Sequence, residues 1–132
     1  MTDVNAYLFF DGNCGEAMKF YEATLGGQLR IVDASEMPGG EGGEGVAHAR
    51  LDVDANGTLM ASDWMAPGIP YPGLNGFRVC LTYGGVDEAR RICEALGEGG
   101  SVQMPFAKTF WAEGFGMVTD KFGVPWMVGT AT

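Results

Sequence analysis

The sequence predicts an α+β fold of two βαβββ modules, whose curled, mixed sheets surround a cavity. Three observations support this fold class. The order of strand-like and helix-like segments in residues 6–63 recurs in residues 77–130. Between them, segment 66–76 holds three prolines and three glycines, as is typical of a linker. An offset of 72 residues also carries Glu16-Ala17 onto Glu88-Ala89, which indicates an internal duplication.

The first module begins with a short apolar strand at 6–10 and a helix at 15–25, which Gly26-Gly27 ends. A strand is expected at 28–34, followed by a glycine-rich, acidic segment at 37–45 that predicts a mobile loop. Two further strands, 46–53 and 58–63, flank Asn56-Gly57, a strong signal for a two-residue hairpin. Alternation in the first of them places His48 and Arg50 on one face and small apolar residues on the other.

The second module repeats this order after the linker. A strand at 77–83 precedes a helix at 86–96. Three strands complete it, at 101–105, 110–119 and 124–130. We therefore expect modules at 1–65 and 77–132, joined by the linker 66–76 into one domain.

Composition excludes several classes of protein. The chain has 132 residues, of which 46% are apolar and 19% charged, as in a globular domain. A net charge of -9 argues against nucleic acid as a partner. Three cysteines without a paired spacing indicate reduced thiols. The start of the chain resembles neither a signal peptide nor a membrane span, so we expect a cytoplasmic protein without a membrane partner.

Long stretches of the chain resemble one known superfamily. The matching pieces are YLFFDGNCGEAMKFYEATLGG, HARLDVDANGTLMASD, VDEARRICEALGEGG and the motif FW-x-x-x-FGM-x-x-D-x-FG-x-x-W within residues 110–126. Together they are similar to the vicinal oxygen chelate superfamily of glyoxalases, bleomycin-resistance proteins and dioxygenases, and most of all to its PhnB-like branch. The resemblance implies a glyoxalase-like fold, a homodimer, and a cavity in each sheet for a small molecule.

Metal-dependent relatives place His, Glu or Gln ligands on inward positions of the first and last strands of each module. Counting back from the helices, those positions fall at Ala6 and Arg78 on the first strands, and at about Ser62 and Met127 on the last. Alanine offers no donor, arginine stays cationic, and methionine is a soft, weak ligand. The usual metal ligands are therefore absent, and we expect no metal or other cofactor.

The remaining polar and aromatic residues on predicted cavity faces are candidates for ligand binding. Arg78 either pairs with an acid such as Asp63 or holds a carboxylate, phosphonate or enolate oxygen, because its donor fork suits planar oxyanions. His48 is either a hydrogen-bonded strand histidine or an acid or base. Cys80 is either a small buried hydrophobe or a nucleophile. The predicted ligand-binding set is Arg78, His48, Arg50, Cys80, Asp63, Phe110 and Trp111.

Aromatic residues should form part of the cavity wall, and these are Trp64, Phe110, Trp111, Phe115, Phe122 and Trp126. Because Phe110 and Trp111 are neighbours on the predicted strand 110–119, one of them must face the cavity. The sequence therefore predicts a binding protein for a small, partly apolar, anionic molecule. Two alternatives stay open: a metal-dependent lyase, isomerase or dioxygenase with non-standard ligands, and a purely structural or partner-binding module whose side chains fill its cavity.

Overall fold

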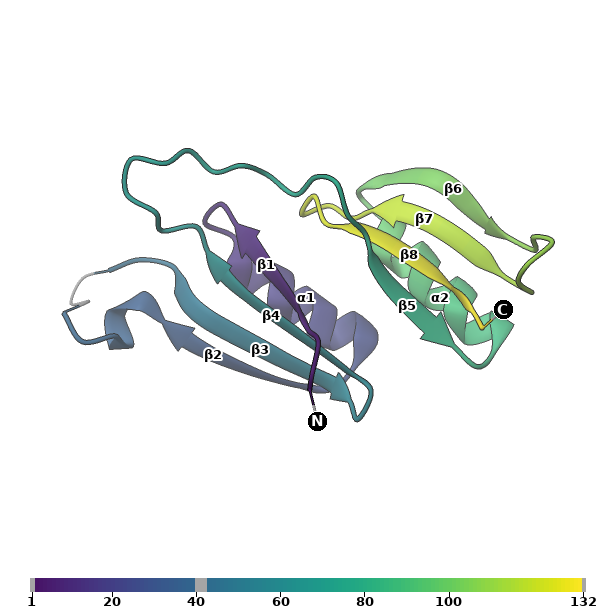
Figure 1. Cartoon of the computed structure of the whole chain (residues 1–132), viewed down its shortest axis with the longest axis horizontal. Coiled ribbons are helices and arrows are strands. Elements are labelled where there is room, and N and C mark those ends of the chain that lie inside the picture. Colours follow the sequence, from purple (N-terminus) through teal and green to yellow (C-terminus); the bar gives the residue numbers. More distant parts are fainter. Residues whose placement is uncertain (1, 40–42, 132) are drawn as a thin grey trace. The chain divides into compact units, whose positions relative to one another are not determined.

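The computed structural model describes residues 2–39 and 43–131. The chain divides into two compact units, Met1–Gly73 and Leu74–Thr132, and each unit has its own sheet, helix and core. Each unit is a βαβββ module with an open, four-stranded, mixed sheet (Figure 1). The predicted α+β fold of two such modules is confirmed.

The first module has the sheet order β1-β4-β3-β2. Strands β1 and β4 are parallel, and the other two pairs are antiparallel. Its elements are β1 (Ala6–Phe10), α1 (Cys14–Leu25), β2 (Gln28–Asp33), the 3-10 turn η1 (Ala34–Glu36), β3 (Val46–Asp54) and β4 (Gly57–Asp63). The predicted loop at 37–45 follows η1, and its residues 40–42 lie outside the described part.

The second module repeats this topology with the sheet order β5-β8-β7-β6. Strands β5 and β8 are parallel, and the pairs β6–β7 and β7–β8 are antiparallel. Its elements are β5 (Val79–Tyr83), α2 (Val86–Gly97), β6 (Ser101–Ala107), β7 (Phe115–Thr119) and β8 (Pro125–Thr130). The predicted strand at 110–119 is thus wrong in its first half, because residues 108–114 form a loop instead.

In each module the helix covers one face of the sheet and leaves the other face open (Figure 1). Leu8 and Phe10 of β1 lie on the covered face and expose 1% of their surface each, whereas Tyr7 and Phe9 alternate with them onto the open face. In the second module Trp126 and Val128 of β8 are fully buried on the covered face. The hydrophobic core therefore lies between helix and sheet, and the open face is available for other contacts.

The two modules do not superimpose at a single offset. Strand β1 ends at Phe10 and α1 begins at Cys14, whereas β5 ends at Tyr83 and α2 begins at Val86. The first connection is one residue longer, so the offset that aligns the helices misaligns the first strands by one position. Ala6 consequently lies on the covered face with Leu8. The strand registers make Asn5 the counterpart of Arg78, and Tyr7 on the open face the counterpart of Cys80.

Asp63, at the end of β4, ties three segments of the first module together. Its carboxylate accepts hydrogen bonds from the main-chain N–H groups of Gly12 (3.1 Å), Cys14 (2.9 Å) and Val46 (2.8 Å). Gly45 makes room for it, since a Cβ there would lie 2.8 Å from Asp63 Oδ2. Two of the donors are at the start of α1, where a negative charge is also favoured by the helix dipole.

We expect Asp63→Ala to lower the free energy of unfolding by roughly 3 kcal/mol, because two buried amides and one partly buried amide lose a charged acceptor. Urea denaturation measures the change. Asp11→Asn is the matched control, since Asp11 is an exposed acid in the neighbouring turn, and its effect should stay within about 0.5 kcal/mol. Equal stability of the two variants would contradict the anchoring role of Asp63.

The three cysteines are free, and their surroundings differ. Burial, reinforced by the charge of Asp63, raises the pKa of the Cys14 thiol to about 12. Burial, reinforced by Glu94, also raises the pKa of Cys93. Cys80 lies exposed on the open face of β5, so its interpretation as a small buried hydrophobe is wrong.

Alkylation of the native protein with iodoacetamide near pH 8 should therefore modify Cys80 rapidly and the other two cysteines slowly, because the thiolate is the reactive form. Peptide mass spectrometry over time gives the rate at each site, and Cys80→Ser should abolish the fast phase. Comparable rates at Cys14 and Cys80 would argue against the burial described above.

Candidate functional site

The open face of the first module carries a polar group beside an aromatic pair. Tyr7 Oη and His48 Nδ1 share a hydrogen bond of 3.3 Å. The Tyr7 ring also lies near Phe9, with ring centroids 5.0 Å apart, and Phe9 contacts Trp64 edge-on at 5.3 Å. The structure thus brings His48 to the predicted face, where it contacts Tyr7, a residue that the sequence analysis did not single out.

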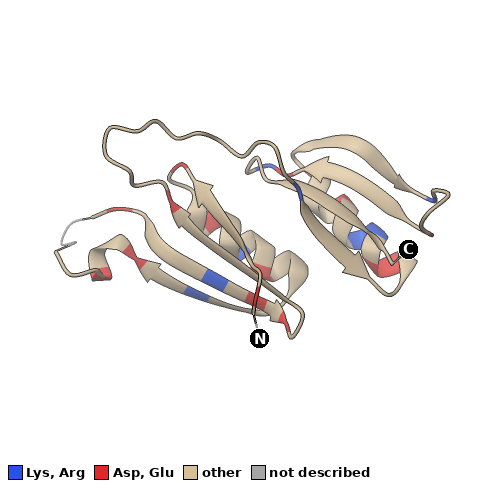
Figure 2. Cartoon of the chain, in the orientation of Figure 1, with Lys and Arg blue, Asp and Glu red and all other residues tan. Residues whose placement is uncertain are grey.

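Arg50 lies on the same face, and its positive charge is balanced by the neighbouring carboxylate of Asp52. Its Nε donates to Asp52 Oδ1 at 3.0 Å, and the Thr58 hydroxyl donates to the same oxygen at 3.1 Å. Desolvation raises the pKa of Asp52, but the hydrogen bonds from Thr58 and Arg50 and the charges of Arg50 and Arg30 outweigh it, so the pKa lies below its usual range. Strands β2 and β3 carry the basic residues of this sheet (Figure 2), and Arg30 pairs in register with Arg50.

Asp63 was predicted as a ligand-binding residue, and the structure commits it to the main chain instead. Its carboxylate is buried, and both of its oxygens accept amide hydrogen bonds. The carboxylate of Asp63 is therefore used within its own module. A sequence alone does not reveal such an anchor, because its partners lie 51, 49 and 17 residues before Asp63 in the chain.

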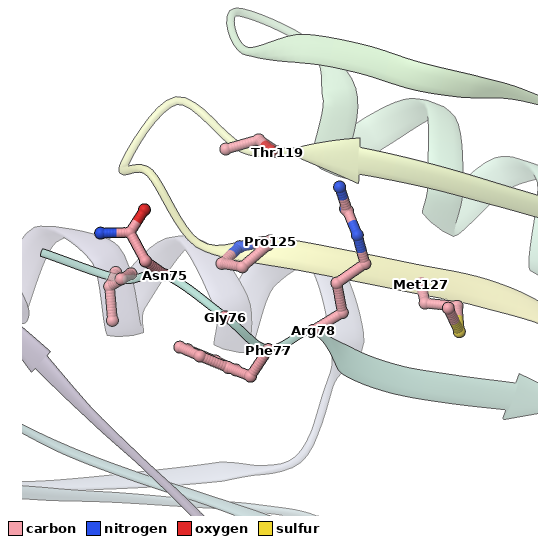
Figure 3. A pocket seen from close by; sticks show the side chains of 8 residues that line it. Asn75, Gly76, Phe77, Arg78, Thr119, Pro125 and Met127 are labelled. Carbon is pink, nitrogen blue, oxygen red and sulfur yellow. The ribbon is translucent and has the colours of Figure 1, made fainter.

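Arg78 precedes β5 and extends across the open face of the second module (Figure 3). Its Nη1 donates to the main-chain oxygens of Val118 (3.1 Å) and Trp126 (3.0 Å), and its Nη2 donates to Gln103 Oε1 (3.3 Å). Gln103 is itself positioned by the Thr119 hydroxyl, which donates to the same Oε1 at 3.1 Å. These contacts hold the guanidinium in one place on the sheet.

A depression of about 620 Å³ lies beside Arg78 (Figure 3). Pro125, Met127 and Phe77 give it an apolar wall, and Thr119 and Asn75 add a hydroxyl and an amide. The full lining is Leu74, Asn75, Gly76, Phe77, Arg78, Thr119, Pro125 and Met127. A depression with one cation, a few neutral polar groups and an apolar wall has the make-up of a small-molecule site.

The other predicted residues of the second module lie elsewhere. Cys80 is on the open face, where it pairs in register with Met127. Phe110 and Trp111 are in the loop before β7, where Phe110 exposes 97% of its surface, so neither is a strand residue facing the Arg78 depression. Trp126 was expected in the wall, but it is buried on the covered face, and its Nε1 donates to Asp120.

Gln103, Thr119 and Asn75 are site residues that the sequence analysis missed. Thr119 could have been found from the alternation of β7 with Met117, whereas Asn75 lies in the linker and carries no such signal. Gln103 is placed by an irregular register between Val102 and Met104, which a periodic pattern cannot predict.

The chemistry of the open-face donors does not suit the metal that the superfamily resemblance implies. The last strands present a hydroxyl at Ser62 and a thioether at Met127, and the first-strand side presents a phenol at Tyr7 and a guanidinium at Arg78. None of these groups is a good ligand for a divalent ion. Within the described ranges, 2–39 and 43–131, no three His, Cys, Asp or Glu side chains converge as a metal site would require. Among the same residues, no helix is long and apolar enough to cross a membrane.

Comparison with known proteins places this geometry in a family. The model of the Glyoxalase/Bleomycin resistance protein/Dioxygenase superfamily matches residues 3–128. Protein YjdN of Escherichia coli (strain K12) is 37% identical over 139 residues, which cover 95% of this chain and 92% of that protein.

Solved structures agree with this match. Protein PA1353 from Pseudomonas aeruginosa is 44% identical with a TM-score of 0.87, over 99% of this chain and 98% of that one. A Bacillus cereus structure, described as a putative 3-demethylubiquinone-9 3-methyltransferase, PhnB protein, is 25% identical with a TM-score of 0.74, over 98% and 100% of the two chains. Because the family match spans nearly the whole chain, the protein belongs to the glyoxalase/bleomycin resistance/dioxygenase superfamily and has a PhnB-like structural neighbour.

Proposed function

We propose that the protein binds a small, partly apolar anion on the open face of its second module, with Arg78 as the anchor. The ligand class is a carboxylate or phosphonate that carries an apolar group. The observation that carries the proposal is a half-buried guanidinium, fixed by neutral acceptors, that has no carboxylate beside it among the described residues.

The remaining donors of Arg78 favour an oxyanion. A guanidinium has five N–H donors, and three of them are used by Val118, Trp126 and Gln103. The Nε–H and one Nη2–H have no partner within residues 2–39 and 43–131. Since Nε and Nη2 share one edge of the planar group, they can donate two parallel hydrogen bonds to a carboxylate or phosphonate.

The surroundings of Arg78 favour a ligand with an apolar part. Met127, Pro125 and Phe77 line the depression beside the cation, and they can bury a hydrocarbon group. No acidic residue lines the depression. The overall charge of -9 opposes anions at long range, but screening over about 8 Å at physiological ionic strength leaves the local cation dominant.

Arg78→Ala should weaken the binding of phenylphosphonate or benzoate by about tenfold to a hundredfold, because a charge-assisted hydrogen bond contributes about 1.5–3 kcal/mol. Isothermal titration calorimetry measures the dissociation constant, with benzyl alcohol as the neutral probe that should gain little from the cation. Arg91→Ala, which removes an exposed arginine of α2, is the charge-matched control.

Arg78 also stabilises the sheet, so its alanine variant requires a second comparison. Arg78→Lys keeps the charge but loses the two-donor edge, and it should bind the anion with intermediate affinity. Circular dichroism confirms that both variants are folded. If the anion binds equally to wild type, Arg78→Ala and Arg91→Ala, Arg78 is not the anchor.

The rival function is a metal-dependent lyase, isomerase or dioxygenase with unusual ligands. Equilibrium dialysis of protein prepared without chelator against Ni²⁺, Zn²⁺ or Mn²⁺ separates the two functions. We expect no stoichiometric binding, because His48 is the single histidine and it contacts Tyr7 rather than a carboxylate. One tightly bound ion per chain, lost in His48→Ala, would favour the enzyme.

We propose further that the binding protein is a cytoplasmic homodimer that sequesters its ligand, as the bleomycin-resistance branch of the superfamily implies. Exposed Tyr7 and Phe9 on an open sheet face support an interface, because such faces are usually covered. The free cysteines fit a reducing compartment. Sedimentation equilibrium that gives the mass of one chain at micromolar concentration would argue against the dimer.

A further inference from the structure

Four side chains on the open face of the second module share one hydrogen-bond network. Gln103 Oε1 accepts hydrogen bonds from Arg78 Nη2 (3.3 Å) and from the Thr119 hydroxyl (3.1 Å). The other end of the same amide, Gln103 Nε2, donates to the Ser101 hydroxyl oxygen at 2.9 Å. Ser101 and Thr119 are a register pair of β6 and β7, so the glutamine links both strands to Arg78.

Arg78 sets the direction of every hydrogen bond in this network. A guanidinium can only donate, so the atom of Gln103 that faces it is the amide oxygen, and the amide nitrogen faces Ser101. An amide oxygen can only accept, so the Thr119 hydroxyl, which lies beside the same oxygen, must use its single proton there. The hydroxyl proton of Thr119 is therefore committed to a group on the neighbouring strand and is not free to turn toward a ligand.

The Thr119 oxygen consequently presents only lone pairs to the depression of about 620 Å³ that this residue lines. Its hydrogen bond to Gln103 is exposed to solvent, so a ligand can reach the oxygen. Within residues 2–39 and 43–131 this oxygen has no second hydrogen-bond partner. A threonine hydroxyl ordinarily donates or accepts as its surroundings require, whereas this one can only accept.

The donors of Arg78 and the acceptor at Thr119 are neighbours, because both residues donate to one oxygen of Gln103. Figure 3 shows Arg78 extending toward the end of β7, where Thr119 lies. Asn75 is the remaining polar side chain of the lining, and its exposed amide offers both donors and an acceptor, so it can turn to suit either kind of ligand. Selection between donors and acceptors on the ligand therefore falls to Thr119.

We propose that the ligand of this depression carries a hydroxyl group beside its oxyanion. The oxyanion accepts hydrogen bonds from the Nε and Nη2 edge of Arg78, the hydroxyl donates to the Thr119 oxygen, and the apolar group packs on Pro125 and Met127. A carbonyl or ether oxygen in place of the hydroxyl would set lone pairs against lone pairs. Gln103 does not touch the ligand and is a positioning residue, which holds Thr119 as an acceptor. This assignment rests on the function proposed for Arg78 and narrows its ligand class to hydroxy acids and hydroxy phosphonates.

Three acids that share a phenyl ring and a carboxylate test the assignment. Mandelate has a hydroxyl on the carbon between these groups, phenylglyoxylate has a carbonyl there, and phenylacetate has neither. In isothermal titration calorimetry, the better enantiomer of mandelate should bind the wild-type chain about threefold to tenfold more tightly than phenylacetate, because one neutral hydrogen bond contributes that much. Phenylglyoxylate should gain nothing over phenylacetate.

Variants of Thr119 and Gln103 locate the origin of this preference. Thr119→Val keeps the side-chain shape without the hydroxyl and should abolish the preference for mandelate, whereas Thr119→Ser should keep it. Thr82→Val is the matched control, since Thr82 is an exposed threonine of β5 outside the depression. Gln103→Met releases the Thr119 proton, so phenylglyoxylate should then bind about threefold more tightly than phenylacetate. A merely structural glutamine would instead change the affinity for all three acids alike.

Arg78→Ala separates this assignment from the function on which it rests. The hydroxyl assignment is overturned, with Arg78 still the anchor, if wild type binds the three acids equally well and Arg78→Ala weakens them all. It is also overturned if the mandelate preference survives Thr119→Val, or if Gln103→Met leaves the affinity for phenylglyoxylate relative to phenylacetate unchanged. Acids that bind wild type and Arg78→Ala with the same affinity would overturn the anchor function of Arg78 as well.

Discussion

Buried carboxylates that bind main-chain amides fix the ends of the strands, and the rest of each module depends on them. Asp63 joins the start of α1, the start of β3 and the end of β4 in the first module. In the second, Asp120 accepts hydrogen bonds from the N–H groups of Phe122 and Val124 and from the Trp126 indole, and so shapes the turn into β8. Neither carboxylate uses the open face. Side chains on that face can therefore change without removing the anchors of the fold.

The order of elements could be predicted because each follows a local pattern: alternation gives β3, and an apolar stripe gives α2. The hairpin between β3 and β4 was expected at Asn56-Gly57, but its two turn residues are Ala55 and Asn56, because Gly57 already pairs with Asp54. The loop at residues 108–114 could not be predicted from such a pattern. Its aromatic residues have high strand propensity, but Thr109 folds the backbone into a turn through its hydroxyl. Local side-chain hydrogen bonds of this kind override propensity, and a sequence pattern does not show which donor a threonine will meet.

The candidate site was predictable only in part. Arg78 was placed on the open face because it alternates with apolar residues in the predicted strand 77–83. Its partners there were not foreseen, because Gln103 lies at a register irregularity in β6. Ala6 was misplaced because one extra residue in the β1–α1 connection shifts the strand relative to the helix. A single inserted residue moves every side chain of a strand to the opposite face of the sheet. A fixed sequence offset between duplicated modules therefore identifies equivalent residues reliably only within one helix or strand.

The strand registers also show how far the two open faces have diverged. His48 and Arg50 of β3 occupy the positions of Phe115 and Met117 in β7. At these two positions the first face is polar, with its cation Arg50 paired to an acid, whereas the second is apolar and its arginine is held by neutral oxygens. A charge-assisted hydrogen bond is stronger where fewer polar groups and less water screen it. The apolar surroundings of Arg78 therefore favour the second face for an amphipathic anion, although the first face carries more basic residues.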